Sequence, residues 1–169
     1  MLEKIIDYLK KREWSYTLSK ISGVLFFPVK GVNGVFNCAV EVSNNDFFFL
    51  FISFNGTNCP PEDRQRFSEL LNRINFNLKF GNFELGMESG EIKFRTSLCY
   101  EDMEINDKII ENIIIRNIYI HDFAFPYFSK FLFGSIPMEE VYAHIFPSAN
   151  PKEIKDKNAS NGNLENNNN

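Results

Sequence analysis

The side chains best suited to chemistry in this sequence are the adjacent pair His121 and Asp122, because an aspartate can orient a histidine for acid–base or nucleophilic catalysis. The pair lies in a segment with helical patterning, where neighbouring residues point in different directions. The two side chains therefore cannot serve each other as a dyad. We expect Asp122 to pack or to form a hydrogen bond to a neighbouring loop, and we identify no catalytic residue.

Motifs for metals and phosphate groups are missing from the sequence. His144 is the only other histidine, and no two histidines stand four residues apart as a helical zinc site would need. The glycine-rich patterns GxGxxG and GxxxxGK do not occur. We therefore predict no metal site, no cofactor and no cofactor-binding residues.

The three cysteines, Cys38, Cys59 and Cys99, lie far apart and form no CxxC motif. An odd number of separated cysteines argues against a disulfide framework and is typical of a reducing cytosol. We expect them to act as small buried hydrophobic residues. Cys59 precedes an expected helix start, where a thiol can become reactive, so this alternative stays open for it.

Length and composition predict one globular domain followed by a tail. The chain has 169 residues, of which 44% are hydrophobic and 24% charged, as in ordinary globular proteins. A domain of about 150 residues can hold a core without disulfides or metals. We expect a single domain at 1–148. Segment 149–169 is polar and rich in asparagine, and we expect it to be disordered.

The charge pattern argues against nucleic acids and membranes as partners. The net charge is −4, and no block of lysine or arginine stands out. The first residues are charged from Glu3 onward and lack the apolar region of a secretory signal. No apolar run approaches the roughly 18 residues of a membrane span. With the cysteine pattern, this composition favours a cytoplasmic protein.

Apolar residues at helical spacing predict helices at both ends of the chain and in its middle. Segments 2–12 and 61–75 show the i, i+3, i+4 pattern, and the second follows a start signal at Pro60 and Pro61. A short helix is expected at 137–146.

A longer segment, 105–133, has features of both a strand and a helix. Its β-branched residues could form a strand by propensity alone. A broad helical stripe, a start signal at Asn106 and a stop signal at Gly134 favour a helix instead. Pro126 would kink or interrupt that helix. We predict a helix here.

Three strands are expected between the first two helices. Turn signals at 33–34 and 44–45 predict two hairpins. With two-residue loops, Val40 lies opposite Phe27 in one hairpin and opposite Phe49 in the other. Apolar residues then face one another throughout, and a slip of one residue would break every match.

A further hairpin is expected around the turn at 89–90. With a loop of two or four residues, Leu85 faces Phe94 on an apolar side. On the polar side, Glu84 lies opposite Arg95 and forms a cross-strand ion pair. That polar side is expected to be solvated.

The strand at 46–54, DFFFLFISF, is apolar on both faces. One row is Phe47, Phe49 and Phe51; the other is Phe48, Leu50, Ile52 and Phe54. Helices could cover both faces, or they could cover one and leave the other for a partner. We name the row Phe48, Leu50, Ile52 and Phe54 as the candidate interaction surface, because an apolar patch of that size is rarely left uncovered in a monomer.

Four segments together resemble the YbjN family, over about Trp14 to Ile145. They are GVNGVFNCAVEV, PPEDRQRFSELLNRINFNLKFGNFEL, GEIKFRTSL and HDFAFPYFSKFLFG. The resemblance implies an α+β fold like that of type III secretion chaperones, with a five-stranded antiparallel sheet in the order α-β-β-β-α-β-β-α. It implies no catalytic residue, because the family is described as regulatory or chaperone-like.

Two classes of function stay open at this point. The first is a non-enzymatic protein-binding or regulatory module that holds a protein segment and self-associates as a homodimer. The second is a small ligand-binding domain or enzyme whose site the sequence does not display. A flat or grooved apolar face would favour the first, and titratable residues in a deep pocket would favour the second.

Overall fold

The computed structural model describes residues 1–147. In chain order the elements are α1 (Leu2–Lys11), β1 (Thr17–Leu18), β2 (Leu25–Lys30), β3 (Val35–Ser43), β4 (Phe48–Asn58), the 3₁₀ turn η1 (Pro61–Asp63), α2 (Arg64–Asn77), β5 (Asn82–Leu85), β6 (Glu91–Cys99), α3 (Asp107–Phe133) and α4 (Met138–Ile145). The predicted tail at 149–169 lies outside the described residues.

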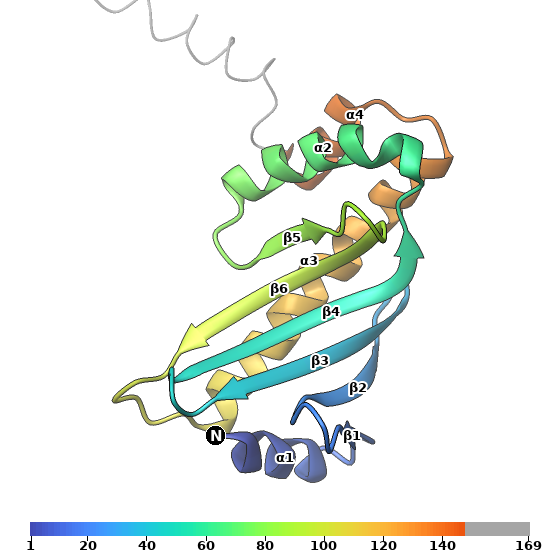
Figure 1. Cartoon of the computed structure of the whole chain (residues 1–169). Helices are drawn as coiled ribbons and strands as arrows, with labels where there is room; N and C mark the ends of the chain where they lie inside the picture. Colours follow the sequence, from blue (N-terminus) through green and yellow to red (C-terminus); the bar gives the residue numbers. More distant parts are fainter. Residues whose placement is uncertain (148–169) are drawn as a thin grey trace, which may run out of the picture.

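The strands form one antiparallel sheet in the order β1-β2-β3-β4-β6-β5 (Figure 1). The predicted α+β class is confirmed, but the predicted number of five strands is wrong, because the sheet has six. The additional strand is β1, whose two residues pair with Leu25 and Phe26. Strand β1 has only two residues, and both are exposed. Such a short strand shows no alternation of apolar and polar residues by which the sequence could reveal it.

A single long helix covers one face of the sheet. Helix α3 has 27 residues and is therefore about 40 Å long. It runs diagonally behind β3, β4 and β6 in Figure 1, with α1 at one end of the sheet and α2 and α4 at the other. No helix within residues 1–147 is both long and apolar enough to cross a membrane.

All three predicted hairpins form, but their strands pair in other registers than predicted. Lys30 pairs with Val35, so the first connection is 31–34, and Val40 lies opposite Leu25 instead of Phe27. The connection between β3 and β4 is 44–47, and Val40 lies opposite Phe51 instead of Phe49. Leu85 lies opposite Ile92 instead of Phe94.

Each register therefore differs from the predicted one by two residues. Because side chains alternate with a period of two, such a shift leaves every residue on its predicted face. Glu84 pairs directly with Lys93, and it forms its ion pair with Arg95 diagonally. Phe47 lies in a loop and not on the strand, with a positive φ of 51°.

The core lies between α3 and the sheet and is rich in phenylalanine. One half of it joins α1 to the first part of α3, and the other joins α2 and α4 to the second part. Its phenylalanines that are at most 3% exposed are Phe27, Phe36, Phe49, Phe51, Phe67, Phe83, Phe94, Phe128 and Phe131. Packing in this core thus accounts for nine of the 19 phenylalanines, and Phe48 and Phe54, which face away from α3 on β4, are not among them.

Both edges of the sheet resist the addition of another strand. At β5, the side-chain amide of Asn75 donates a hydrogen bond of 2.8 Å to the Phe83 carbonyl and accepts another of 2.8 Å from the Phe83 N–H. At the other edge, β1 pairs with β2 only at Leu25 and Phe26. Beyond that pair, Pro28 has no N–H to offer a further strand.

Candidate functional site

A buried polar network lies between α3 and the sheet. The hydroxyl of Ser53 on β4 donates a hydrogen bond of 2.6 Å to Asn117 Oδ1, and its Oγ lies 2.9 Å from His121 Nδ1. Asn117 Nδ2 donates 3.1 Å to the Phe94 carbonyl and 3.2 Å to Thr96 Oγ1. These polar side chains are at most 3% exposed.

The hydrogen-bond directions in this network do not activate Ser53. Its single hydroxyl hydrogen points to Asn117, so His121 Nδ1 carries a hydrogen and donates it to Ser53 Oγ. A nucleophilic serine would need the opposite direction. Burial lowers the pKa of His121 to about 4, against a smaller opposing effect of the Asp122 charge. The imidazole is therefore neutral at neutral pH.

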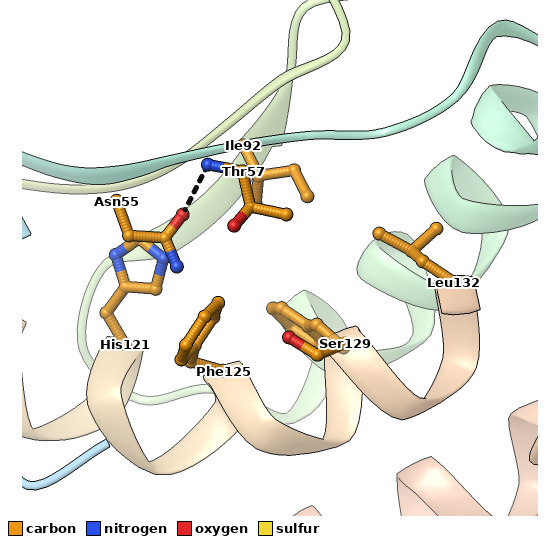
Figure 2. A pocket seen from close by; sticks show the side chains of 8 residues that line it. Asn55, Thr57, Ile92, His121, Phe125, Ser129 and Leu132 are labelled. Atoms are coloured by element: carbon orange, nitrogen blue, oxygen red, sulfur yellow. Dashed lines mark hydrogen bonds between the residues drawn. The ribbon is translucent and has the colours of Figure 1, made fainter. Parts of the chain in front are cut away.

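The cavity beside His121 is very small. It is lined by α3, β4 and β6 residues that include Asn55, Phe125 and Ser129, and its volume is about 10 Å³ (Figure 2). That is enough for about one water molecule. Beside it, the Thr57 N–H donates 3.0 Å to Asn55 Oδ1. A substrate does not fit in this space.

Asp122 does not point at His121 but at the first hairpin. Its carboxylate accepts hydrogen bonds from the backbone N–H of Val32, at 2.9 Å, and of Asn33, at 2.8 Å. The predicted hydrogen bond from Asp122 to a neighbouring loop is therefore confirmed. Gly31 permits this approach, because a Cβ there would lie 2.3 Å from Asp122 Oδ1.

Pro126 completes the same junction. Helix α3 continues through this proline, which has no N–H for the Asp122 carbonyl four residues before it. The side-chain amide of Asn33 donates 3.0 Å to that carbonyl instead. Asn33, Asp122 and Pro126 thus form one structural unit, which places two of the segments resembling YbjN in direct contact.

Replacing Asp122 tests this unit. Asp122→Ala removes two charge-assisted hydrogen bonds, and we expect it to lower the free energy of unfolding by about 2–3 kcal/mol. Asp122→Asn keeps one acceptor and should lose about half as much. Amide hydrogen exchange at Val32 and Asn33 should accelerate in both variants. Unchanged exchange in Asp122→Ala would contradict the assignment.

Two of the three cysteines, Cys38 and Cys59, are buried as expected, and burial raises the pKa of Cys59 to about 11. The alternative of a reactive Cys59 is therefore wrong. Burial also raises the pKa of Cys38. Cys99 is exposed, so the expectation of a buried residue is wrong at that position. Within residues 1–147, no group of three His, Cys, Asp or Glu side chains is arranged to hold a metal ion.

The remaining candidate is the outer face of the sheet, meaning the face turned away from α3. Phe49, Phe51 and Ser53 of β4 are buried against α3, so the alternate residues of β4 point outward. These are Phe48, Leu50, Ile52 and Phe54, and all four are half-buried. Among residues 1–147, no helix lies in front of β3, β4 and β6 in Figure 1.

Neighbouring strands extend this apolar row. Ile52 lies beside Ala39, and Ala39 lies beside Phe26, which is 41% exposed. A shallow recess of about 290 Å³ opens next to Phe54 and Pro28. The polar residues Asn37, Glu41, Lys93, Arg95 and Ser97 surround the apolar row.

The buried network of Ser53, Thr96 and Asn117 was not predicted from the sequence. A signal was present, since Asn117 and His121 are four residues apart on the buried stripe of α3. Ser53 likewise occupies an inward position of a strand whose other inward residues are phenylalanines.

Comparisons with known proteins agree with this geometry at the level of the fold. No family model and no curated protein matches the chain by sequence. A crystal structure of YbjN from E. coli matches with a TM-score of 0.56, over 69% of this chain and 82% of that one. The fold is that of YbjN. The sequence identity is 13%, so the likeness to YbjN shows the fold alone.

The YbjN structure is described as that of a candidate transcription regulator. That description belongs to the E. coli protein. The resemblance to YbjN predicted from the sequence is confirmed at the level of the fold.

Proposed function

We propose that this chain is a non-enzymatic protein-binding module of regulatory type, acting in the cytoplasm, which holds a protein partner on the outer face of its sheet. The observation that carries the proposal is the outward row Phe48, Leu50, Ile52 and Phe54 on a sheet with a helix on its other face. Antiparallel sheets often leave one face to water, but that face is then usually polar.

The composition of the row supports this reading. Two large aromatic and two aliphatic side chains stand on one central strand, with Phe26 and Pro28 beyond β3. Polar residues surround them, as they surround the core of protein interfaces. The recess beside Phe54 offers space for an apolar side chain of the partner.

The face supports binding better than the edges of the sheet do. Asn75 occupies the backbone groups of Phe83 at one edge, and Pro28 lacks a donor at the other. Strand addition needs a row of free backbone groups. We therefore expect side-chain contacts on the face to provide the affinity.

Photo-cross-linking in cells tests the proposal. A benzophenone amino acid replaces Leu50 on the outer face or, as the matched control, Tyr119 on α3, which is 69% exposed. We expect light-dependent protein adducts from the Leu50 position and few from the Tyr119 position. Absence of adducts at Leu50, or equal yields at both positions, would contradict the proposal.

A further inference from the structure

We propose that Asn33 is a site of spontaneous deamidation, and that its contacts with Asp122 on α3 suppress this reaction while the first hairpin is docked on the helix. When that junction opens, deamidation converts Asn33 to a carboxylate, which prevents the junction from closing as before. This inference goes beyond the proposed binding function and does not depend on the outer face of the sheet.

The residue after Asn33 makes it chemically labile. It is Gly34, and glycine has no Cβ to shield its backbone nitrogen or to restrict the conformations that ring closure needs. The same pair recurs at 55–56 and at 161–162, of which the last lies outside the described residues. Asn33 is exposed in the connection 31–34, so water reaches it.

The reaction at Asn33 consumes only water. The Gly34 nitrogen forms a bond to Cγ of Asn33 and loses its hydrogen as a proton. The bond from Cγ to Nδ2 breaks, and Nδ2 takes up a proton and leaves as ammonia. Water then opens the resulting cyclic imide at either carbonyl carbon, which gives aspartate or isoaspartate. One water is consumed for each ammonia released, and nothing is oxidised or reduced.

The contacts with Asp122 hold the group that must leave. Nδ2 of Asn33 donates a hydrogen bond of 3.0 Å to the Asp122 carbonyl and lies 3.4 Å from its Oδ2. The Asn33 N–H donates 2.8 Å to Asp122 Oδ1, and the Gly31 N–H donates 2.8 Å to the Gly34 carbonyl. Departure of Nδ2 breaks the bond to the Asp122 carbonyl. Donation from Nδ2 also strengthens the amide resonance, which makes Cγ less open to attack. The reaction therefore proceeds from the locally opened junction.

The pair at 55–56 supplies a matched comparison in the same chain. Asn55 Oδ1 accepts a hydrogen bond of 3.0 Å from the Thr57 N–H, which draws electrons away from its Cγ. Its Nδ2 has no hydrogen-bond partner among residues 1–147. Gly56 is exposed, and a Cβ there would meet no heavy atom within 4 Å. No bond of the leaving nitrogen opposes the reaction at Asn55, so we expect it to be faster there than at Asn33.

Deamidation at Asn33 places a second carboxylate in the junction. An ionised carboxylate only accepts hydrogen bonds, so the Asp122 carbonyl loses the donor that replaces the missing N–H of Pro126. The new charge also stands beside the Asp122 carboxylate, and like charges at such a distance repel. The modified junction is therefore weaker, and the product marks each chain whose hairpin has come away from α3.

Peptide mass spectrometry of the full chain, incubated at mildly alkaline pH, measures both rates. In urea, Asn33 and Asn55 should react at similar rates. In the folded wild type, Asn33 should be slower than in urea by about tenfold or more, because reaction requires local opening. Asp122→Ala should accelerate the reaction at Asn33 by about tenfold and leave that at Asn55 unchanged. Asp122→Asn, which keeps one acceptor, should give an intermediate rate at Asn33 and serves if the alanine variant does not fold.

Three results of this experiment would overturn the inference. They are a folded wild type in which Asn33 reacts as fast as in urea, Asp122 variants in which its rate is unchanged, and an equal acceleration at Asn55. The last result would assign the protection to the fold as a whole and not to the junction.

The effect of the product is tested by comparing Asn33→Asp with Asn33→Ala. Both variants remove the donor, but only the first adds the charge. Amide hydrogen exchange at Val32, whose N–H donates 2.9 Å to Asp122 Oδ2, reports how often the junction opens. Exchange should be faster in Asn33→Asp than in Asn33→Ala, and both should exceed the wild type. Equal or slower exchange in Asn33→Asp would contradict the claim that the product keeps the junction open.

Discussion

Phe94→Ala should lower the free energy of unfolding by about 3–5 kcal/mol, the usual cost of removing a buried phenylalanine. Phe94 is fully buried, and its ring centroid lies 4.6 Å from that of Phe83. Phe94 also contacts the polar network, because its carbonyl accepts a hydrogen bond from Asn117. Such a loss is a large share of a typical stability of about 5–15 kcal/mol.

Urea unfolding followed by circular dichroism measures this effect. Phe76→Ala is the matched control, because Phe76 is 88% exposed on α2 and the same change there should alter stability by less than about 0.5 kcal/mol. A loss below about 1 kcal/mol in Phe94→Ala would mean that Phe94 is not part of the core.

Acidification should destabilise the fold through His121. The folded-state pKa of this group is lowered to about 4 from an ordinary 6.5. The unfolded chain therefore binds a proton below about pH 6.5, whereas the folded chain does so only near pH 4. The contribution of His121 to the free energy of unfolding is fully present above pH 6.5 and decreases as the pH falls toward 4. The total decrease is about 3 kcal/mol, since one pKa unit corresponds to about 1.4 kcal/mol.

Unfolding free energies at pH 7 and pH 5 isolate this contribution. The wild type should lose about 2 kcal/mol more between these values than His121→Gln, which cannot be protonated there. His144→Gln is the control, because His144 is exposed on α4. If His121→Gln lost as much stability as the wild type, His121 would not be buried in its neutral form.

The faces of the sheet could be predicted from the sequence, while the pairing partners could not. Alternation fixes which side each residue occupies, but an Asn-Gly signal does not fix the length of a connection. At 31–34, the length depends on Asp122, about 90 residues away, which binds the backbone of Val32 and Asn33. At 44–47, the Tyr100 N–H donates 2.7 Å to the Phe47 carbonyl. Such distant contacts have no local signal.

The long helix α3 could likewise be predicted only in part. Its existence follows from the stripe and from Asn106, whose side chain accepts 3.1 Å from the Ile109 N–H. Its passage through Pro126 does not, because the compensating donor is Asn33 in another element. Propensity alone therefore left a strand and an interrupted helix open.

For the candidate site, the sequence supplied the outward row of β4 but not which face the helices cover. Both rows of this strand are apolar, so hydrophobicity cannot separate them. Ser53 decides the matter, because it shares a buried network with Asn117 on α3. That pairing joins residues 64 positions apart and becomes visible only in the folded chain.

The most direct test of the outer face is the cross-linking yield of the Leu50-probe protein with and without Phe48→Asp. Phe48 and Leu50 point outward from the same strand, so a charge at Phe48 should remove the adducts while circular dichroism stays that of the folded chain. A folded Phe48→Asp protein with undiminished adducts would contradict the proposed interface. Unfolding of that variant would instead mean that the row is buried core, where an unpaired charge is not tolerated.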